Sequence, residues 1–199
     1  MFLHMLSDTD KEEFLKYATL LSLSDNPLHW DGKSLDELTG NVALDTAEFQ
    51  EVESEKTVLD GLIQECGKDP SRSIWHVGFG RSEEYVFSEI AKSLLGKLVV
   101  LPLRKMEDKE DRIKAAGEVL KEIHYHAGTD LGLPSISKVM LHELMLLALA
   151  DGEVSTVEGA LLKQFAALHK LDDYTYDDLL ERAEGMNREA SKTLALILE

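Results

Sequence analysis

The sequence contains very little cysteine: Cys66 is the one cysteine among 199 residues. A single thiol excludes a disulfide framework and a cysteine-based metal cluster within one chain. Long apolar runs are also missing, because the most apolar stretch, 139–150, is interrupted by His142 and Glu143 and is shorter than the roughly 20 residues that cross a bilayer. The N-terminal stretch has no basic start, so we predict no signal peptide and expect a cytoplasmic protein.

Basic side chains are the second shortage. Lysine and arginine number 21 against 38 aspartates and glutamates, which gives a net charge of −17. This balance argues against nucleic acid or an anionic membrane as a partner, since both are bound through positive charge. The acidic excess falls in residues 1–60 and 150–199, whereas residues 61–149 are nearly balanced. The expected partners are therefore a divalent cation or a basic protein, with a homodimer as a further expectation.

Apolar side chains recur mostly at helical spacing, so the predicted fold class is all-α: a single helical domain. Two acidic helix–turn–helix halves, 1–60 and 138–199, would flank an inserted helical segment, 61–137. We expect two short strands near 73–79 and 97–103. The run at 139–150 is apolar on nearly every side, which predicts a helix at the centre of the core. The remaining predicted helices are a short one after Ser34 and those that span 10–24, 53–66, 82–96, 107–126, 155–170, 175–185 and 187–199.

The two ends of the chain share a pattern. Residues 20–25 (LLSLSD) resemble 146–151 (LLALAD), and both segments close an apolar helix with an aspartate. Asp31-Gly32 with a cap at Ser34 likewise resembles Asp151-Gly152 with a cap at Ser155. The pattern predicts either a duplicated helix–turn–helix unit or a chance likeness between leucine-rich helices that end in acidic turns.

Residues 150–155 (ADGEVS), with Glu158 three residues further on, resemble the signature of the tellurite-resistance TerB-like family. The resemblance is clearest over 138–185 and weaker over 5–40, and no part of 61–137 resembles a family we can name. It implies an all-helical fold, a role in tellurite resistance and stress response, and a divalent-cation site formed by acidic residues of the two halves.

Five acidic residues are the candidate metal ligands: Asp151, Glu153, Glu158, Asp25 and Asp31. If the two halves pack together, their turns would bring these carboxylates close. Carboxylates about 4 Å apart repel by roughly 1 kcal/mol in water and about 4 kcal/mol at an effective dielectric of 20, so a cluster needs protons, bases or a cation. Oxygen ligands suit Ca²⁺, Mg²⁺ or Mn²⁺.

A purely structural interpretation of the same residues is also open. Asp-Gly is an ordinary turn dipeptide, and Ser155 with Glu158 completes a capping box that employs Glu158 without any metal. Acidic side chains also favour the positive end of a helix.

Three functions follow from these interpretations. The first is a non-enzymatic TerB-like stress protein with an acidic, cation-binding face, and the second is a helical adaptor that docks a basic partner without metal. The third is a phosphate- or nucleotide-using enzyme, because Gly78–Ser82 could hold a phosphate at a helix N-terminus. That loop lacks the third glycine of a dinucleotide fingerprint, and we predict no catalytic residue.

Overall fold

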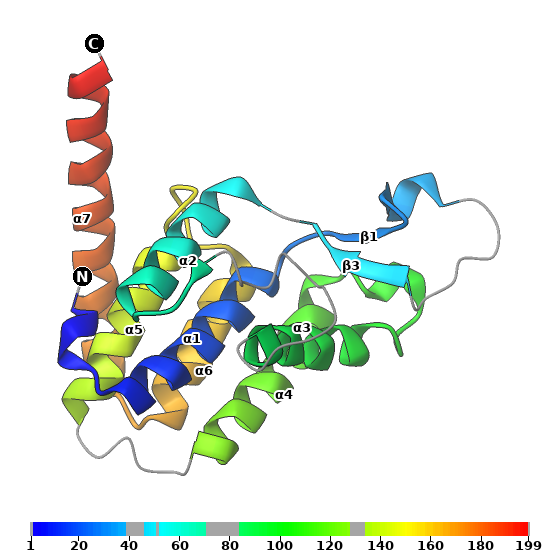
Figure 1. The fold of residues 1–199 in the computed structure, drawn as a ribbon, viewed down its shortest axis with the longest axis horizontal. Helices are drawn as coiled ribbons and strands as arrows, with labels where there is room; N and C mark the ends of the chain where they lie inside the picture. The colour runs from blue at the N-terminus through cyan, green and yellow to red at the C-terminus, as the bar shows by residue number, and fades with distance from the viewer. Residues whose placement is uncertain (1, 39–45, 51, 71–83, 128–133, 199) are drawn as a thin grey trace.

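The computed structural model describes the chain except for residues 1, 39–45, 51, 71–83, 128–133 and 199. The fold is mainly α, as predicted (Figure 1). The described helices are α1 (Asp8–Leu23), α2 (Glu53–Glu65), α3 (Glu84–Leu98), α4 (Lys109–Ala127), α5 (Pro134–Ala148), α6 (Thr156–Leu168) and α7 (Asp173–Leu198), with short 3₁₀ turns η1 (Leu3–Met5), η2 (Leu35–Glu37) and η5 (Leu103–Lys105).

Helices α1 and α5 form the centre of the core. Helix α1 packs against α2, α3, α4 and α5, and α5 packs against α1, α2, α6 and α7. The prediction that the apolar run at 139–150 is buried is confirmed, because α5 is buried along most of its length, including the polar His142 and Glu143. Because α1 and α5 pack against each other, the two acidic segments that contain them share one core.

Helix α1 begins earlier than the sequence pattern predicts. Ser7 is its N-cap, and its hydroxyl accepts a hydrogen bond from the Asp10 N–H while the Asp10 carboxylate accepts one from the Ser7 N–H. The predicted helix 10–24 was thus right in its body but late at its start. A second correction concerns 175–185 and 187–199, which are parts of one continuous helix, α7.

A small antiparallel sheet follows α1. Strands β1 (Leu28–Trp30), β2 (Lys33–Ser34) and β3 (Ala47–Phe49) form a sheet in the order β2-β1-β3. Asp31 and Gly32 have φ values of 51° and 74°, the left-handed conformation that a two-residue hairpin turn requires at both positions. The first acidic segment therefore continues as a hairpin and the 3₁₀ turn η2, rather than as a second α-helix.

Two further strands are predicted from the sequence, near 73–79 and 97–103. The strand predicted near 97–103 is wrong: α3 runs on to Leu98, and the chain then reaches η5 through turns. The physical reason is that Leu94 and Leu98, one helical turn apart, are both fully buried and so continue the apolar stripe of α3. The strand predicted near 73–79 lies outside the described residues.

Candidate metal centre

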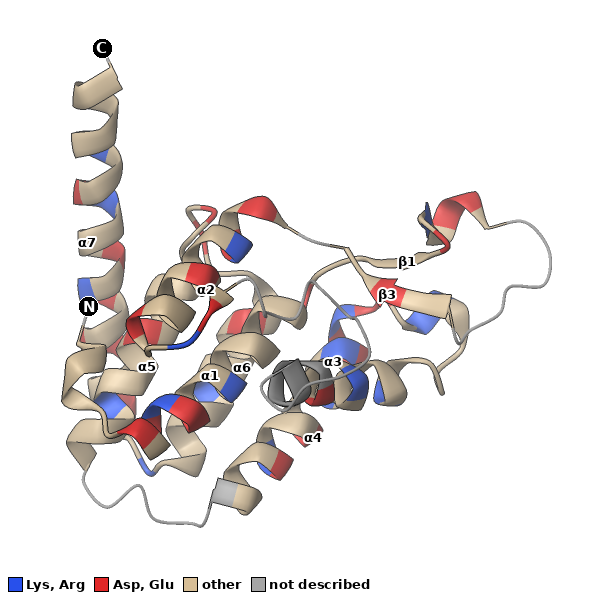
Figure 2. Cartoon of the chain, in the orientation of Figure 1, with Lys and Arg blue, Asp and Glu red and all other residues tan. Residues whose placement is uncertain are grey.

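Three carboxylates from three separate parts of the chain meet at one point beside the core. Asp25 follows the C-cap of α1, Glu55 lies in the first turn of α2, and Glu158 lies in the first turn of α6. One carboxylate oxygen from each residue lies within 4.8 Å of the other two. We call these three residues the carboxylate cluster. Figure 2 shows the acidic residues, in red, on α2 and on the neighbouring elements.

The backbone on either side of Asp25 is held by buried hydrogen bonds. The guanidinium of Arg112, on α4, is 2% exposed and donates to the carbonyl oxygens of Ser24 (3.2 Å) and Asn26 (2.7 Å). The Ser24 hydroxyl donates to the Leu21 carbonyl oxygen at 2.8 Å. Asp25 is therefore presented on a fixed loop, and its Oδ1 atom is buried with no hydrogen-bond partner among the described residues.

Glu55 occupies a core-facing position of α2. It lies four residues before Leu59 and seven before Leu62, both of which are fully buried. The Glu55 side chain is only 8% exposed, and its Oε2 atom is buried without a hydrogen-bond partner among the described residues. Burial, with a further contribution from the negative charge of Asp25, raises the pKa of Glu55 to about 7, while the nearby Ser22 hydroxyl acts in the opposite direction.

Glu158 completes the N-terminal cap of α6 and also belongs to the carboxylate cluster. Its carboxylate accepts a hydrogen bond from the Ser155 N–H (2.8 Å), while the Ser155 hydroxyl accepts one from the Glu158 N–H (3.2 Å), so the predicted capping box is present. Glu158 is also 4% exposed. Burial is the main cause that raises its pKa to about 8, and the charges of Asp25 and Glu55 raise it further, while the hydrogen bonds from Ser155 act in the opposite direction.

This arrangement has the chemistry of a site for a hard cation. Three carboxylates offer oxygen ligands only, and such ligands suit Ca²⁺, Mg²⁺ and Mn²⁺. The three oxygens lie within 4.8 Å of one another, so small movements of the side chains would let one ion contact all three. Mg²⁺ and Mn²⁺ prefer shorter bonds and would need the three side chains to close slightly.

The structure brings together two of the five predicted ligands, Asp25 and Glu158. Asp151 and Glu153 are exposed in the turn between α5 and α6, although the charge of Asp151 does contribute to raising the pKa of Glu55. Asp31 is exposed at the hairpin turn between β1 and β2. In the described part of the chain, none of these three belongs to the carboxylate cluster.

Sequence reasoning missed Glu55. The signal that could have found it is a glutamate on the apolar stripe of α2, at the spacing that places it beside Leu59 and Leu62. An acidic residue at a core position is unusual unless it is paired or binds a cation.

Other titratable side chains and the predicted phosphate loop do not belong to the carboxylate cluster. Cys66 is buried, and burial raises the pKa of its thiol to about 11, so it is a core residue without thiolate character. His124 packs edge-on against His169 with ring centroids 4.7 Å apart, and burial lowers the pKa of His169 to about 4. The phosphate-binding loop considered at Gly78–Ser82 lies outside the described residues.

The fold and the cluster together define a mainly α protein with a largely buried group of three carboxylates. A scan against protein-family models, a search of curated proteins and a search of solved structures found no match to this chain. Within the described ranges, no helix is both long and apolar enough to cross a bilayer.

Proposed function

We propose that this chain is a non-enzymatic protein that binds one divalent cation through Asp25, Glu55 and Glu158. The observation that carries the proposal is the buried, unpartnered Oε2 atom of Glu55, which lies in a cluster with two other carboxylates. An ionised carboxylate in such a place is costly unless a cation or a proton compensates its charge. A divalent cation can contact all three carboxylates and offsets two of their three negative charges.

Ca²⁺ is the ion that the spacing favours, ahead of Mn²⁺ and Mg²⁺. The oxygens have to move least to reach the longer bonds of Ca²⁺, whereas the smaller ions require a tighter cage. Asp151 is a candidate for a further, water-mediated ligand, because its charge already acts on Glu55. The resemblance to the TerB-like family supports a divalent cation and adds the proposal of a role in tellurite resistance and stress response.

The test is isothermal titration of the metal-free protein with Ca²⁺, Mn²⁺ and Mg²⁺, with wild type compared to Glu55→Gln. We expect one cation per chain for the wild type and at least a tenfold weaker affinity for Glu55→Gln, because one of three charged ligands is lost. The matched control is Glu53→Gln, which removes an exposed charge from the same helical turn and should leave the affinity unchanged.

Two outcomes would overturn the proposal. One is the absence of both heat and thermal stabilisation with all three ions. The other is an equal loss of affinity in Glu53→Gln and Glu55→Gln, which would mean that the ions respond only to net charge. Either result would leave the metal-independent adaptor, which docks a basic protein, as the better interpretation of the acidic surface.

A further inference from the structure

Buried polar atoms without a partner gather at the end of α1 and the start of α2. Among the described residues, Thr19, Ser22, Asp25, Asn26 and Glu55 each have a side-chain nitrogen or oxygen that is buried and forms no hydrogen bond. Such atoms are rare in folded proteins, because each one costs free energy. Asp25 and Glu55 belong to the carboxylate cluster, so we ask which of the remaining side chains adjoins it.

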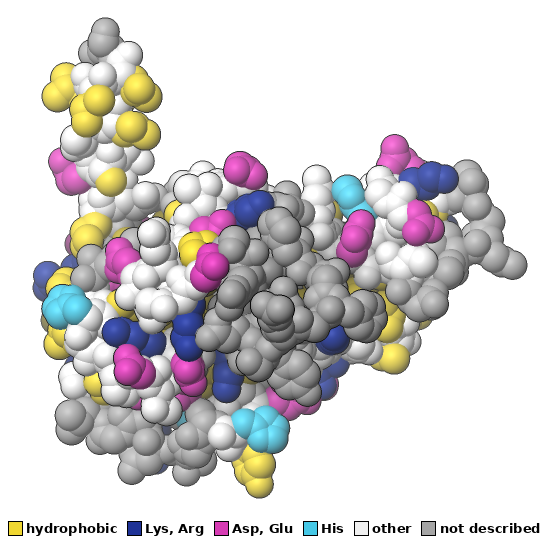
Figure 3. Space-filling model, viewed as in Figure 1, with side chains coloured by type: hydrophobic (Ala, Val, Ile, Leu, Met, Phe, Trp, Pro, Cys, Tyr) yellow, Lys and Arg dark blue, Asp and Glu magenta, His cyan; other side chains and the backbone are white. Residues whose placement is uncertain are grey.

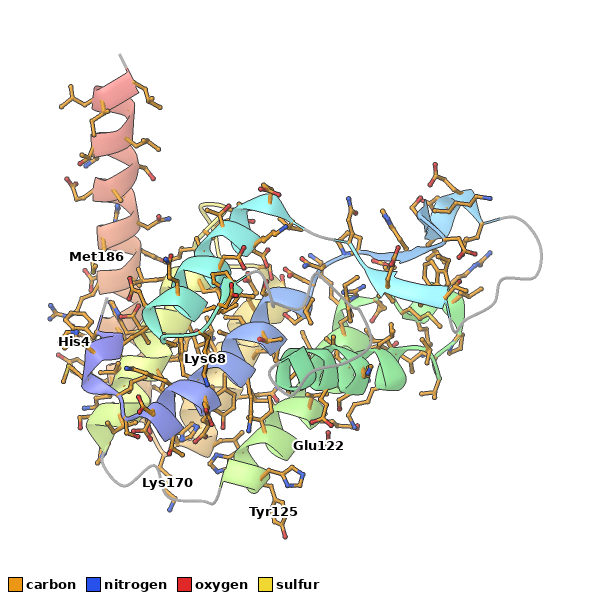
Figure 4. The ribbon with its side chains drawn as sticks, viewed as in Figure 1. His4, Lys68, Glu122, Tyr125, Lys170 and Met186 are labelled. Carbon is orange, nitrogen blue, oxygen red and sulfur yellow. The ribbon has the colours of Figure 1, made fainter. Side chains whose placement is uncertain are left out.

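Helix α2 runs antiparallel to α1, which brings its first turn beside the end of α1. Lys68, just beyond the end of α2, forms an ion pair with Glu12 near the start of α1, with 3.1 Å between Lys68 Nζ and Glu12 Oε1 (Figure 4). At the opposite end of the pair of helices, Glu55 meets Asp25. Ser22 lies one helical turn before Asp25, and its hydroxyl offsets part of the rise in the pKa of Glu55. The Ser22 hydroxyl therefore adjoins the carboxylate cluster.

The hydroxyl of Ser22 differs from that of the neighbouring serine. Ser22 and Ser24 are both 1% exposed. A serine within a helix commonly donates to a backbone carbonyl one turn earlier, and the Ser24 hydroxyl does so to the Leu21 carbonyl oxygen at 2.8 Å. The Ser22 oxygen forms no such bond in the part of the chain that the structure describes. Its hydroxyl is thus available for another contact.

Helix packing does not require a hydroxyl at this position. The likeness between residues 20–25 and 146–151 pairs Ser22 with Ala148, which is also almost fully buried. It pairs Asp25 with Asp151, which is exposed and lies outside the carboxylate cluster. The hydroxyl is therefore present in the segment whose aspartate belongs to the cluster, and absent from the segment whose aspartate does not.

Burial separates the cluster from the other acidic residues. Figure 3 shows exposed acidic side chains, in magenta, spread over one face of the molecule with basic side chains between them. Water and neighbouring charges compensate such groups at little cost. Ser22, Glu55 and Glu158 are all almost fully buried, so water reaches them poorly. Protein oxygens must therefore supply much of the coordination of an ion at this place.

We propose that the Ser22 hydroxyl is a fourth ligand of the cation, in direct contact with the ion that the carboxylate cluster binds. This inference rests on the proposed function and names a further ligand of the same site. The hydroxyl supplies a neutral oxygen, which adds a ligand without adding negative charge to a buried place. Its proton then turns to the Ala18 carbonyl oxygen, four residues earlier in α1. Ca²⁺, which takes roughly six to eight oxygen ligands, gains most from such a contact.

Calorimetric titration of the full chain with Ca²⁺ and Mn²⁺ tests this ligand. We expect Ser22→Ala to bind either ion about tenfold more weakly than the wild type. The matched control is Thr19→Val, which removes another buried, unpartnered hydroxyl from the same helix. Thr19 lies six residues before Asp25, about 9 Å of helix, which is too far to contact the same ion, so its replacement should leave the affinity unchanged.

Replacement by cysteine distinguishes direct contact from an indirect effect. In Ser22→Cys a soft sulfur would touch the ion, so the affinity for thiophilic Cd²⁺ should rise at least about tenfold relative to that for Ca²⁺, with a new sulfur-to-cadmium absorption in the ultraviolet. Thr19→Cys is the control, and the buried Cys66 is common to both variants. Urea denaturation of the metal-free proteins should show Ser22→Ala to be no less stable than the wild type, because the lost hydroxyl has no partner.

Three results would overturn the inference in a protein that binds cations. Equal cation affinities of Ser22→Ala and Thr19→Val would show that the hydroxyl is not a ligand. An equal preference of Ser22→Cys and Thr19→Cys for Cd²⁺ would rule out direct contact, even if Ser22→Ala binds weakly. A marked loss of stability in metal-free Ser22→Ala would assign the hydroxyl to the fold. A wild type that binds no cation would overturn the proposed function as well, so the two failures are distinguishable.

Discussion

At the scale of single residues, Glu55 and Glu158 are the least ordinary groups of the structure. Both are glutamates of normal chemistry whose pKa values rise because folding removes them from water and places them beside other carboxylates. A proton or a cation relieves the same repulsion, so the two compete for this site. The cluster should therefore bind cations more weakly as the pH falls through the range in which Glu55 and Glu158 take up protons.

This competition gives a prediction for the metal-free protein. The folded pKa values of about 7 and 8 lie above the values near 4.5 that glutamates have when unfolded, so between about pH 4.5 and 8 the folded state holds more protons. The contribution of these groups to the free energy of unfolding is then fully favourable below about pH 4.5 and is lost as the pH rises to about 8. Each shift corresponds to a few kcal/mol at most, since one pKa unit is about 1.4 kcal/mol.

Urea denaturation of the wild type and of Glu55→Gln at several pH values measures this effect. We expect Glu55→Gln to gain stability relative to the metal-free wild type as the pH rises from about 5 to 8, by about 1–3 kcal/mol. Saturating Ca²⁺ should remove much of the loss in the wild type, because the bound ion takes the place of the protons. Parallel pH profiles for the two proteins without metal would contradict the assignment of Glu55.

At the scale of secondary-structure elements, the helices were largely predictable, because apolar stripes at helical spacing also set the buried faces. The hairpin was missed, although Asp31-Gly32 is a typical two-residue turn, since the flanking strands of two and three residues give almost no alternating pattern. The break expected near Gly185 was wrong because one glycine costs a helix only about 1 kcal/mol, which the contact between α5 and α7 offsets.

Two of the three residues of the carboxylate cluster could be predicted from the sequence. The likeness between residues 20–25 and 146–151 singled out the ends of α1 and α5, and from there Asp25 and Glu158 could be reached. Glu55 depends on the way α2 returns to pack beside α1, which no local pattern contains. Contacts between distant parts of the chain therefore bring Glu55 into the cluster. Such contacts also keep Asp31 away from the other acidic residues.

The cap of α6 allows a prediction at this scale. Ser155→Ala removes the hydroxyl that accepts from the Glu158 N–H, and we expect a loss of about 1 kcal/mol in the free energy of unfolding. The cation affinity should also fall, because Ser155 helps to fix the first turn that presents Glu158. The matched control is Ser7→Ala, which breaks the equivalent capping box of α1. Ser7 lies at the N-terminal end of this helix, whereas Asp25 follows its C-terminal end.

We expect Ser7→Ala to lower stability by a similar amount and to leave the cation affinity unchanged. Chemical denaturation measures the first quantity and calorimetric titration the second. Equal affinities for Ser7→Ala, Ser155→Ala and the wild type would show that capping and cation binding by Glu158 are independent.

At the scale of the whole molecule, Arg112 connects the middle of the chain to its acidic beginning. Besides the carbonyl oxygens of Ser24 and Asn26, its guanidinium donates to the Met106 carbonyl oxygen at 2.9 Å and to the Glu107 carboxylate at 3.3 Å. Glu107 also accepts a hydrogen bond from the Leu28 N–H at 2.9 Å. One buried network thus positions the start of α4, the end of α1 and the start of the sheet.

Arg112→Met should therefore affect both folding and the cluster. We expect a loss of about 3 kcal/mol in the free energy of unfolding, because several buried acceptors lose their donor. Cation affinity should fall as well, since the backbone on both sides of Asp25 is no longer held. Lys114→Met, an exposed position on the same helix, is the control and should change neither quantity. Full cation affinity in a destabilised Arg112→Met would show that Asp25 is positioned by other contacts.

The positions of the three carboxylates along the chain have a further consequence. A divalent ion held by residues 25, 55 and 158 would tie together segments that are far apart in sequence, as a disulfide bridge does in secreted domains. Such a tie restricts the unfolded chain most when the loops that it closes are long. Because the one thiol of the protein is buried, the ion would serve as a reversible cross-link. Calcium depletion would then destabilise the packing of α1, α2 and α6 together.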